Sequence, residues 1–151
     1  TIGNRVAGNV KLNSETKEIM TQRFGKDTIL ALATLENGVP YVRNVNAYYE
    51  DGTFYIITYA LSNKMKQIEN NPKVAIAGDW FTGHGNGTSL GYFGKKENEA
   101  IAKKLKAAFS AWIDNGHNNF DDENTCILSI TLTDGILFSQ GKKYDIDFTT
   151  N

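Results

Sequence analysis

The sequence predicts a mainly β protein of the α+β class whose strands form an antiparallel barrel. Its 151 residues suit a single domain, residues 1–151. About seven short strand-like segments alternate with three helical ones, and tight-turn dipeptides occur at Asn37-Gly38, Asp51-Gly52 and Asp134-Gly135. Short strands joined by hairpins leave edges that must be covered, which favours a closed barrel with flanking helices. A two-sheet sandwich is the alternative.

The first half of the chain is expected to form a helix followed by an antiparallel meander. Ser14 can cap a helix that runs to about Phe24. No capping box is expected there, because Lys17 occupies the third helical position. The turn dipeptides return the chain immediately, which excludes parallel winding in this half. Strands are expected at 28–35, 41–49 and 54–58.

The second half contains two further helices and a glycine-rich segment. Helices are expected over 62–70 and over 101–113, the latter ending near Gly116. Residues 82–87 are predicted to be a flexible hairpin loop, because a strand follows where a dinucleotide-binding loop needs a helix. His84 in this loop is expected to be a mobile polar residue. Further strands are expected at 74–80 and 88–93, and the segments 126–132, 136–139 and 144–148 are expected to supply two or three closing strands.

Composition and charge exclude several classes of function. Sixteen Lys and Arg against seventeen Asp and Glu leave a net charge of −1, without the basic excess typical of nucleic-acid binding. No run approaches the roughly 18 apolar residues of a membrane span. The single cysteine, Cys126, cannot form an intrachain disulfide and suits a reducing compartment, so a cytoplasmic protein is expected. No metal site is expected, since the acidic run 121–123 lacks calcium-loop spacing.

Two features point to an anion site. Arg43 shares a strand face with Val45 and Ala47, so its guanidinium is expected to be half-buried and to need either a local carboxylate or an anionic ligand. Ser62 and Lys64 lie where a strand gives way to a helix, whose first N–H groups attract anions. Taken alone, Ser62 could merely cap the helix and Lys64 could be solvated. One arginine and one lysine together would neutralise a phosphomonoester.

No Ser/His/Asp or Cys/His arrangement is evident, so the catalytic residues stay unassigned. If the protein is an enzyme, its reactive group is expected to be borrowed. A flavin fits, because the flavin ring performs the electron chemistry while the protein supplies position and electrostatics.

The residues around the anion site resemble those of a known family. The stretch Pro40-x-x-Arg43-x-Val45, the segment Phe54-Tyr55-Ile56-Ile57-Thr58 and the motif Lys64-x-x-Gln67-Ile68-Glu69-Asn70-Asn71-Pro72-x-Val74 are similar to the FMN-binding split barrels related to pyridoxamine 5′-phosphate oxidase. The similarity extends to the general-stress and nitroimidazole-reductase branch of that family. It implies a six-stranded split barrel and a homodimer with FMN at the subunit interface.

The same resemblance implies a set of cofactor-binding residues. Arg43 and Lys64 would hold the FMN phosphate with Ser62 and Asn63 beside them. The ring and ribityl chain would lie along the strand residues Asn44, Val45, Asn46, Ile57 and Thr58, and the partner subunit would contribute Trp80 and Phe138.

The sequence departs from the namesake oxidases. They carry a basic residue in place of Asn63, a lysine in place of Tyr48 and an Arg-x-His motif near the C-terminus. The resemblance therefore implies an FMN-dependent oxidoreductase resembling a flavin reductase, with NADH or NADPH as electron donor and an unassigned substrate. A binding protein of the same fold that holds flavin, deazaflavin or haem without turnover is the alternative.

Overall fold

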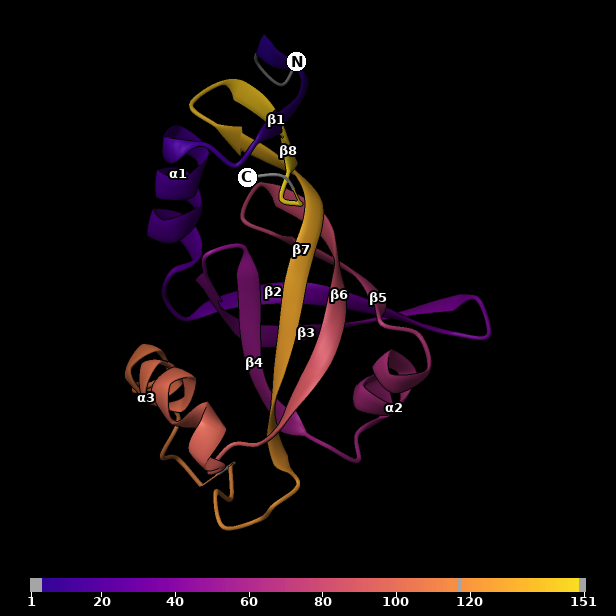
Figure 1. Cartoon of the computed structure of the whole chain (residues 1–151), viewed down its shortest axis with the longest axis vertical. Coiled ribbons are helices and arrows are strands. Elements are labelled where there is room, and N and C mark those ends of the chain that lie inside the picture. The colour runs from indigo at the N-terminus through magenta and orange to yellow at the C-terminus, as the bar shows by residue number, and fades with distance from the viewer. Residues whose placement is uncertain (1–3, 117, 150–151) are drawn as a thin grey trace.

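A computed structural model describes residues 4–116 and 118–149 and contains a closed barrel of six antiparallel strands (Figure 1). The barrel order is β7-β4-β3-β2-β5-β6, and β6 pairs back onto β7. Every pair in this ring is antiparallel, so the predicted barrel is confirmed and the sandwich alternative is wrong. The strands are β2 (Thr28–Glu36), β3 (Val39–Glu50), β4 (Thr53–Tyr59), β5 (Lys73–Gly78), β6 (Phe81–Tyr92) and β7 (Thr125–Ser139).

Two further strands extend the sheet beyond one end of the barrel. β8 (Lys142–Asp147) pairs with the last part of β7, and β1 (Asn4–Lys11) lies parallel to β8. The sequence reading assigned no strand to residues 4–11. Figure 1 shows this β1–β8 extension at the top, next to the first helix.

α1 (Ser14–Phe24) covers the same end of the barrel and buries Met20 and Phe24. The predicted cap is wrong, because Asn13 rather than Ser14 starts the helix. The Asn13 side chain accepts a hydrogen bond from the Thr16 backbone N–H at 2.9 Å, and the Thr16 hydroxyl accepts one from the Asn13 N–H at 3.0 Å. A capping box is therefore present, with threonine in the role that glutamate often takes.

α2 (Asn63–Asn70) and α3 (Glu99–Ala108), which follows the short 3₁₀ turn η1 (Lys96–Asn98), flank the opposite end of the barrel (Figure 1). α3 packs on the outside of β4 and β7, in an apolar cluster separate from the barrel interior. α3 ends at Ala108, whereas the sequence predicted a helix to residue 113. From the sequence, His117 is expected at the end of this helix, and it lies outside the described residues. No helix of the described chain is long and apolar enough to cross a bilayer.

The glycine-rich segment is a strand and not the predicted loop. Gly83, Gly85 and Gly87 alternate along β6 toward the interior, while the residues between them are exposed. A Cβ on Gly85 would lie 2.6 Å from the Thr131 carbonyl oxygen, so only glycine fits this close approach. His84 is on the exposed face, where Nδ1 lies 2.8 Å from a carboxylate oxygen of Asp134.

Two turns lie at other positions than predicted, which were Asp134-Gly135 and residues 82–87. Asp134-Gly135 lies within β7, which continues to Ser139 and turns at Gln140-Gly141. The hairpin between β5 and β6 turns at Asp79 and Trp80, whose φ angles are 44° and 61°. This left-handed pair is typical of a type I′ turn, although Asn-Gly is its usual sequence.

Candidate functional site: a cleft between β3 and β4

Within the closed barrel, β3 and β4 pair with each other at one end only and are not hydrogen-bonded along the rest of this junction. β3 pairs with β2 over residues 39–47 but with β4 only at residues 48–50. All of β4, residues 53–59, pairs with β7 on its other edge, so residues 56–59 have a strand partner on that edge alone. A cleft of about 450 Å³ lies in this region, within the size range of small-molecule sites. Its lining comes from β3, β4, α2 and the segment after α3: Asn44, Val45, Asn46, Ile56, Ile57, Lys64, Trp112, Asn115 and Asn118.

Lys64 is a half-buried cation on the cleft wall. α2 begins just before it, and the Ser62 side chain caps the helix by accepting a hydrogen bond from the Met65 N–H at 3.4 Å. The Lys64 ammonium donates a hydrogen bond to the Thr58 hydroxyl on β4. Burial lowers the pKa of Lys64, and the nearby charge of Arg43 lowers it further.

Arg43 points into the barrel, because it pairs across the sheet with the fully buried Leu32. Its Nη1 donates to the Thr34 hydroxyl at 2.7 Å and to the Leu32 carbonyl at 3.2 Å. Its Nη2 donates to the side-chain oxygen of Gln67 on α2 at 3.1 Å. Thr34 and Gln67 are buried and also hydrogen-bond to each other. These neutral acceptors fix the orientation of the guanidinium without neutralising its charge.

One edge of the Arg43 guanidinium remains open. Within the described chain, Nε–H and the second hydrogen of Nη2 have no acceptor, and burial lowers the pKa of Arg43. Neither Arg43 nor Lys64 forms an ion pair with a carboxylate of the described residues. The sequence left two partners open for Arg43, a local carboxylate or an anionic ligand. The described residues provide no such carboxylate. Two partly desolvated cations beside a helix N-terminus favour an anionic ligand.

The structure brings most of the residues named from the sequence to this region. Asn44, Val45, Asn46, Ile57 and Lys64 line the cleft together. Thr58 and Arg43 adjoin it through Lys64, by a hydrogen bond and by charge, respectively. Ser62 serves as the helix cap, and Asn63 is exposed and does not line the cleft.

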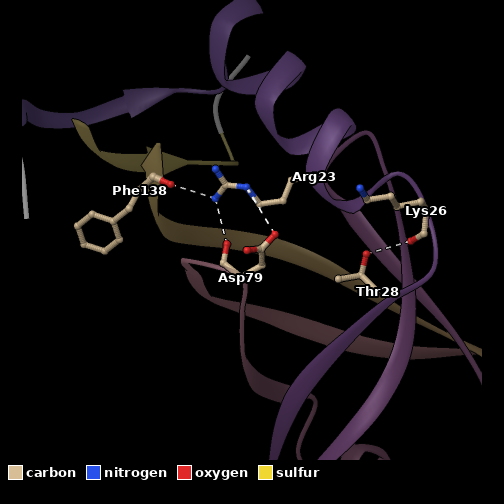
Figure 2. Close-up of polar contacts among 5 residues, drawn as sticks. All are labelled: Arg23, Lys26, Thr28, Asp79 and Phe138. Atoms are coloured by element: carbon tan, nitrogen blue, oxygen red, sulfur yellow. Dashed lines mark hydrogen bonds and ion pairs between the residues drawn. The ribbon is translucent and has the colours of Figure 1, made fainter. Parts of the chain in front are cut away.

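Trp80 and Phe138 do not line the cleft of their own chain. They form an edge-to-face aromatic pair with ring centroids 6.3 Å apart, and the Phe138 N–H donates to the Trp80 carbonyl at 3.0 Å. Figure 2 shows Arg23 of α1 next to Asp79 and Phe138, where its Nη1 donates to both backbone carbonyls at 3.0 Å. Trp80 is 70% exposed, so this corner presents an indole to its surroundings.

The sequence reading missed one wall of the cleft. Trp112, Asn115 and Asn118 lie after α3, where a continuous helix had been predicted. The Trp112 indole donates to the Asp27 carboxylate at 2.8 Å and stacks on Phe109 with a centroid distance of 4.8 Å. The turn-forming residues from Asp114 onward are the signal that could have ended the predicted helix earlier.

Comparisons with known proteins agree with this architecture. A family model described as pyridoxamine 5′-phosphate oxidase matches residues 15–137. General stress protein 26 of Bacillus subtilis (strain 168) is 30% identical over 114 residues, which cover 75% of this chain and 81% of that protein.

Two solved structures share the fold. A haem-binding protein from Mycobacterium smegmatis superposes with a TM-score of 0.67 at 14% identity, over 91% of this chain and 59% of that chain. A FAD-binding protein from Mesorhizobium loti gives a TM-score of 0.59 at 16% identity, over 82% and 92% of the two chains. At these identities the structures report on the fold alone. The family match and the Bacillus relative together carry the assignment, and the chain belongs to the pyridoxamine 5′-phosphate oxidase family.

Proposed function

We propose that the protein binds FMN in the cleft between β3 and β4 and acts as an FMN-dependent oxidoreductase, similar to flavin reductases, with NADH or NADPH as electron donor. The observation that carries this proposal is the pair Arg43 and Lys64. Each is partly desolvated and without a carboxylate partner in the described chain. A phosphate monoester would supply the negative charge that these two side chains lack.

The positive charge of Arg43 and Lys64 suits the phosphate of the cofactor, and the cleft volume of about 450 Å³ lies in the range of small-molecule sites. The remaining N–H groups of Lys64 and the open edge of Arg43 would hold the phosphate, next to Ser62 and Asn63. Val45, Ile57 and Thr58 would contact the ribityl chain and ring, with Asn44 and Asn46 along the same strand. When bound, a flavin would supply the hydride chemistry, and the cleft residues would position its ring. No residue of the described chain is assigned a role in proton transfer.

We further propose that the protein is a cytoplasmic homodimer in which the partner contributes Trp80 and Phe138 to the flavin site. Large apolar side chains on the barrel surface support this proposal, since Val42 and Trp80 are each 70% exposed and Ile29 is 64% exposed. Exposed apolar side chains gathered on one protein often mark an interface. The buried free thiol of Cys126 suits a reducing compartment.

The direct test compares FMN with riboflavin, which lacks only the phosphate. FMN should bind more tightly, with flavin absorbance and fluorescence as the readout, and inorganic phosphate should compete with it. Arg43→Ala should weaken FMN binding by roughly 1.5–3 kcal/mol, the usual scale for hydrogen bonds to a charged group, and leave riboflavin binding nearly unchanged. Equal affinity of the wild-type protein for FMN and riboflavin would refute the phosphate site.

A second candidate function is a carrier of flavin, deazaflavin or haem without turnover. This candidate is supported by the superposition, over 91% of this chain, on a protein described as haem-binding. Anaerobic addition of NADH or NADPH to the FMN complex separates the two functions. Bleaching of the flavin absorbance supports the oxidoreductase, whereas an unchanged oxidised spectrum supports the carrier.

A further inference from the structure

Asp27 connects two walls of the cleft through one carboxylate. It immediately precedes β2, and its Oδ1 accepts a hydrogen bond from the side-chain Nδ2 of Asn46 at 3.0 Å. Its Oδ2 accepts one from the indole Nε1 of Trp112 at 2.8 Å. Asn46 and Trp112 both line the cleft, on β3 and on the segment after α3, while Asp27 does not line it. Asp27 therefore fixes the positions of two groups that face the ligand space without facing that space itself.

The Asp27 contact also fixes which way the Asn46 carboxamide points. An ionised carboxylate can only accept hydrogen bonds, so Asn46 must present its NH₂ group to Asp27 and turn its carbonyl oxygen the other way. Within the described chain, no donor reaches that oxygen. Asn46 thus offers the cleft an oriented acceptor, and an acceptor of this kind selects for a ligand with an N–H group.

We propose that Asn46, held by Asp27, recognises the imide N–H of a pyrimidine-type ring edge, and that Asp27 is the positioning residue for this contact. The inference rests on the proposed flavin function and extends it to the recognition of the ring. The isoalloxazine of a flavin carries such an imide at N3, and a haem does not. Trp112 forms the adjacent aromatic wall, kept in place by Asp27 and by stacking on the fully buried Phe109.

The test uses FMN and its N3-methyl analogue, in which the imide hydrogen is replaced. Wild-type protein should bind FMN at least ten times more tightly than N3-methyl-FMN, because a site that places an acceptor for a ligand N–H rejects a ligand that lacks that donor. Asn46→Ala should reduce this ratio to near one. Asp27→Asn should also reduce it, because Asn46 and Trp112 donate to separate carboxylate oxygens and an amide at position 27 offers only one oxygen, so that the Asn46 carboxamide is no longer held in one orientation.

Lys64→Ala is the matched control. It should weaken the binding of both compounds by the same factor, since the two share the phosphate, and leave their ratio at the wild-type value. A wild-type ratio near one, or a ratio unchanged in Asn46→Ala, overturns the inference while the FMN site itself stands. Failure of the wild-type protein to bind FMN overturns the proposed function instead. Circular dichroism and thermal melting confirm that each variant is folded, and Asn46→Ala decides the matter should Asp27→Asn not fold.

Discussion

Arg43 and Lys64 lie close enough that the charge of Arg43 adds to burial in lowering the pKa of Lys64. They come from β3 and α2, and neither has a carboxylate partner in the described chain. Two like charges that are partly removed from water oppose folding of the ligand-free protein. A stabilising anion is therefore expected to come from outside the chain. The two charges are expected to lower the stability of the ligand-free protein and to strengthen the binding of an anionic ligand.

Lys64→Met is expected to stabilise the ligand-free protein and to weaken FMN binding. The substitution removes a desolvated charge that faces Arg43 and keeps the aliphatic length of the side chain. The free energy of unfolding should rise by roughly 0.5–2 kcal/mol, the usual range for a single stabilising substitution, while FMN affinity falls about tenfold or more. Denaturant unfolding without FMN and a flavin titration measure the two effects.

Lys66→Met provides the control on the same helix, because Lys66 is exposed. It should change both quantities little. A Lys64→Met protein that is less stable than the wild type would mean that Lys64 supports the fold, and the view of it as an uncompensated ligand-binding charge would then be wrong.

Gln67→Glu is expected to remove the preference for FMN over riboflavin. Gln67 accepts from Arg43 and from Thr34 at a buried position, and glutamate has nearly the same shape. The new carboxylate would give Arg43 the anionic partner that it lacks and would repel a phosphate. The ratio of FMN to riboflavin affinity should fall roughly tenfold, the scale of one charge-assisted hydrogen bond. Retention of the full wild-type ratio would place the phosphate away from Arg43.

The affinity for FMN is expected to fall at alkaline pH, and to begin falling below the ordinary lysine pKa of 10.5. The pKa of Lys64 is lowered in the free protein, so this side chain loses its charge earlier than a solvated lysine does. Affinity measured from pH 7 upward should decrease as Lys64 deprotonates, and the Lys64→Met variant should lack this decrease. A wild-type profile that matches that of Lys64→Met would show that Lys64 does not contact the ligand.

The same shift fixes the sign of the effect of pH on folding. The folded pKa of Lys64 is lower than the unfolded one, so between the two values the unfolded chain binds more protons. The contribution of Lys64 to the free energy of unfolding therefore rises with pH in that window. Its unfavourable effect is fully present below the folded pKa and is relieved as the pH approaches 10.5.

The parts of the fold that could be predicted are those encoded by local turn chemistry. Asn37-Gly38 and Asp51-Gly52 adopt positive φ angles and join β2, β3 and β4 as expected. The β5–β6 hairpin was placed wrongly because its turn, Asp79-Trp80, contains no glycine. The glycines of β6 suggested a loop, although their spacing of two is that of one strand face. They are small because β7 and α2 approach closely, which is a property of the tertiary structure.

In the candidate site, too, the residues of local motifs could be predicted and those joined only by tertiary packing could not. Arg43 and Lys64 could be named because they belong to short local motifs beside a strand and a helix start. Trp112 and Asp27 could not be paired from the sequence, since 85 positions separate them and only the packing of the post-α3 segment joins them. The hydrogen bond from Arg43 to the Gln67 side chain could not be predicted either, because the two residues meet only when α2 packs over the end of β2.

Val42→Glu is expected to convert the proposed dimer into a monomer and to weaken FMN binding at a distance from the cleft. Val42 is 70% exposed on the outer face of β3 and lines a separate hollow of about 390 Å³ with small side chains of β2 and β5. A charge there should not disturb the fold of one chain but should oppose burial against a second copy. Light scattering should report half the wild-type mass, and FMN affinity should fall because the contacts proposed for Trp80 and Phe138 of the partner subunit would be lost. Ala100→Glu on the exposed face of α3 should leave both mass and affinity unchanged. A wild-type protein that binds FMN fully as a monomer would show that one chain completes the site.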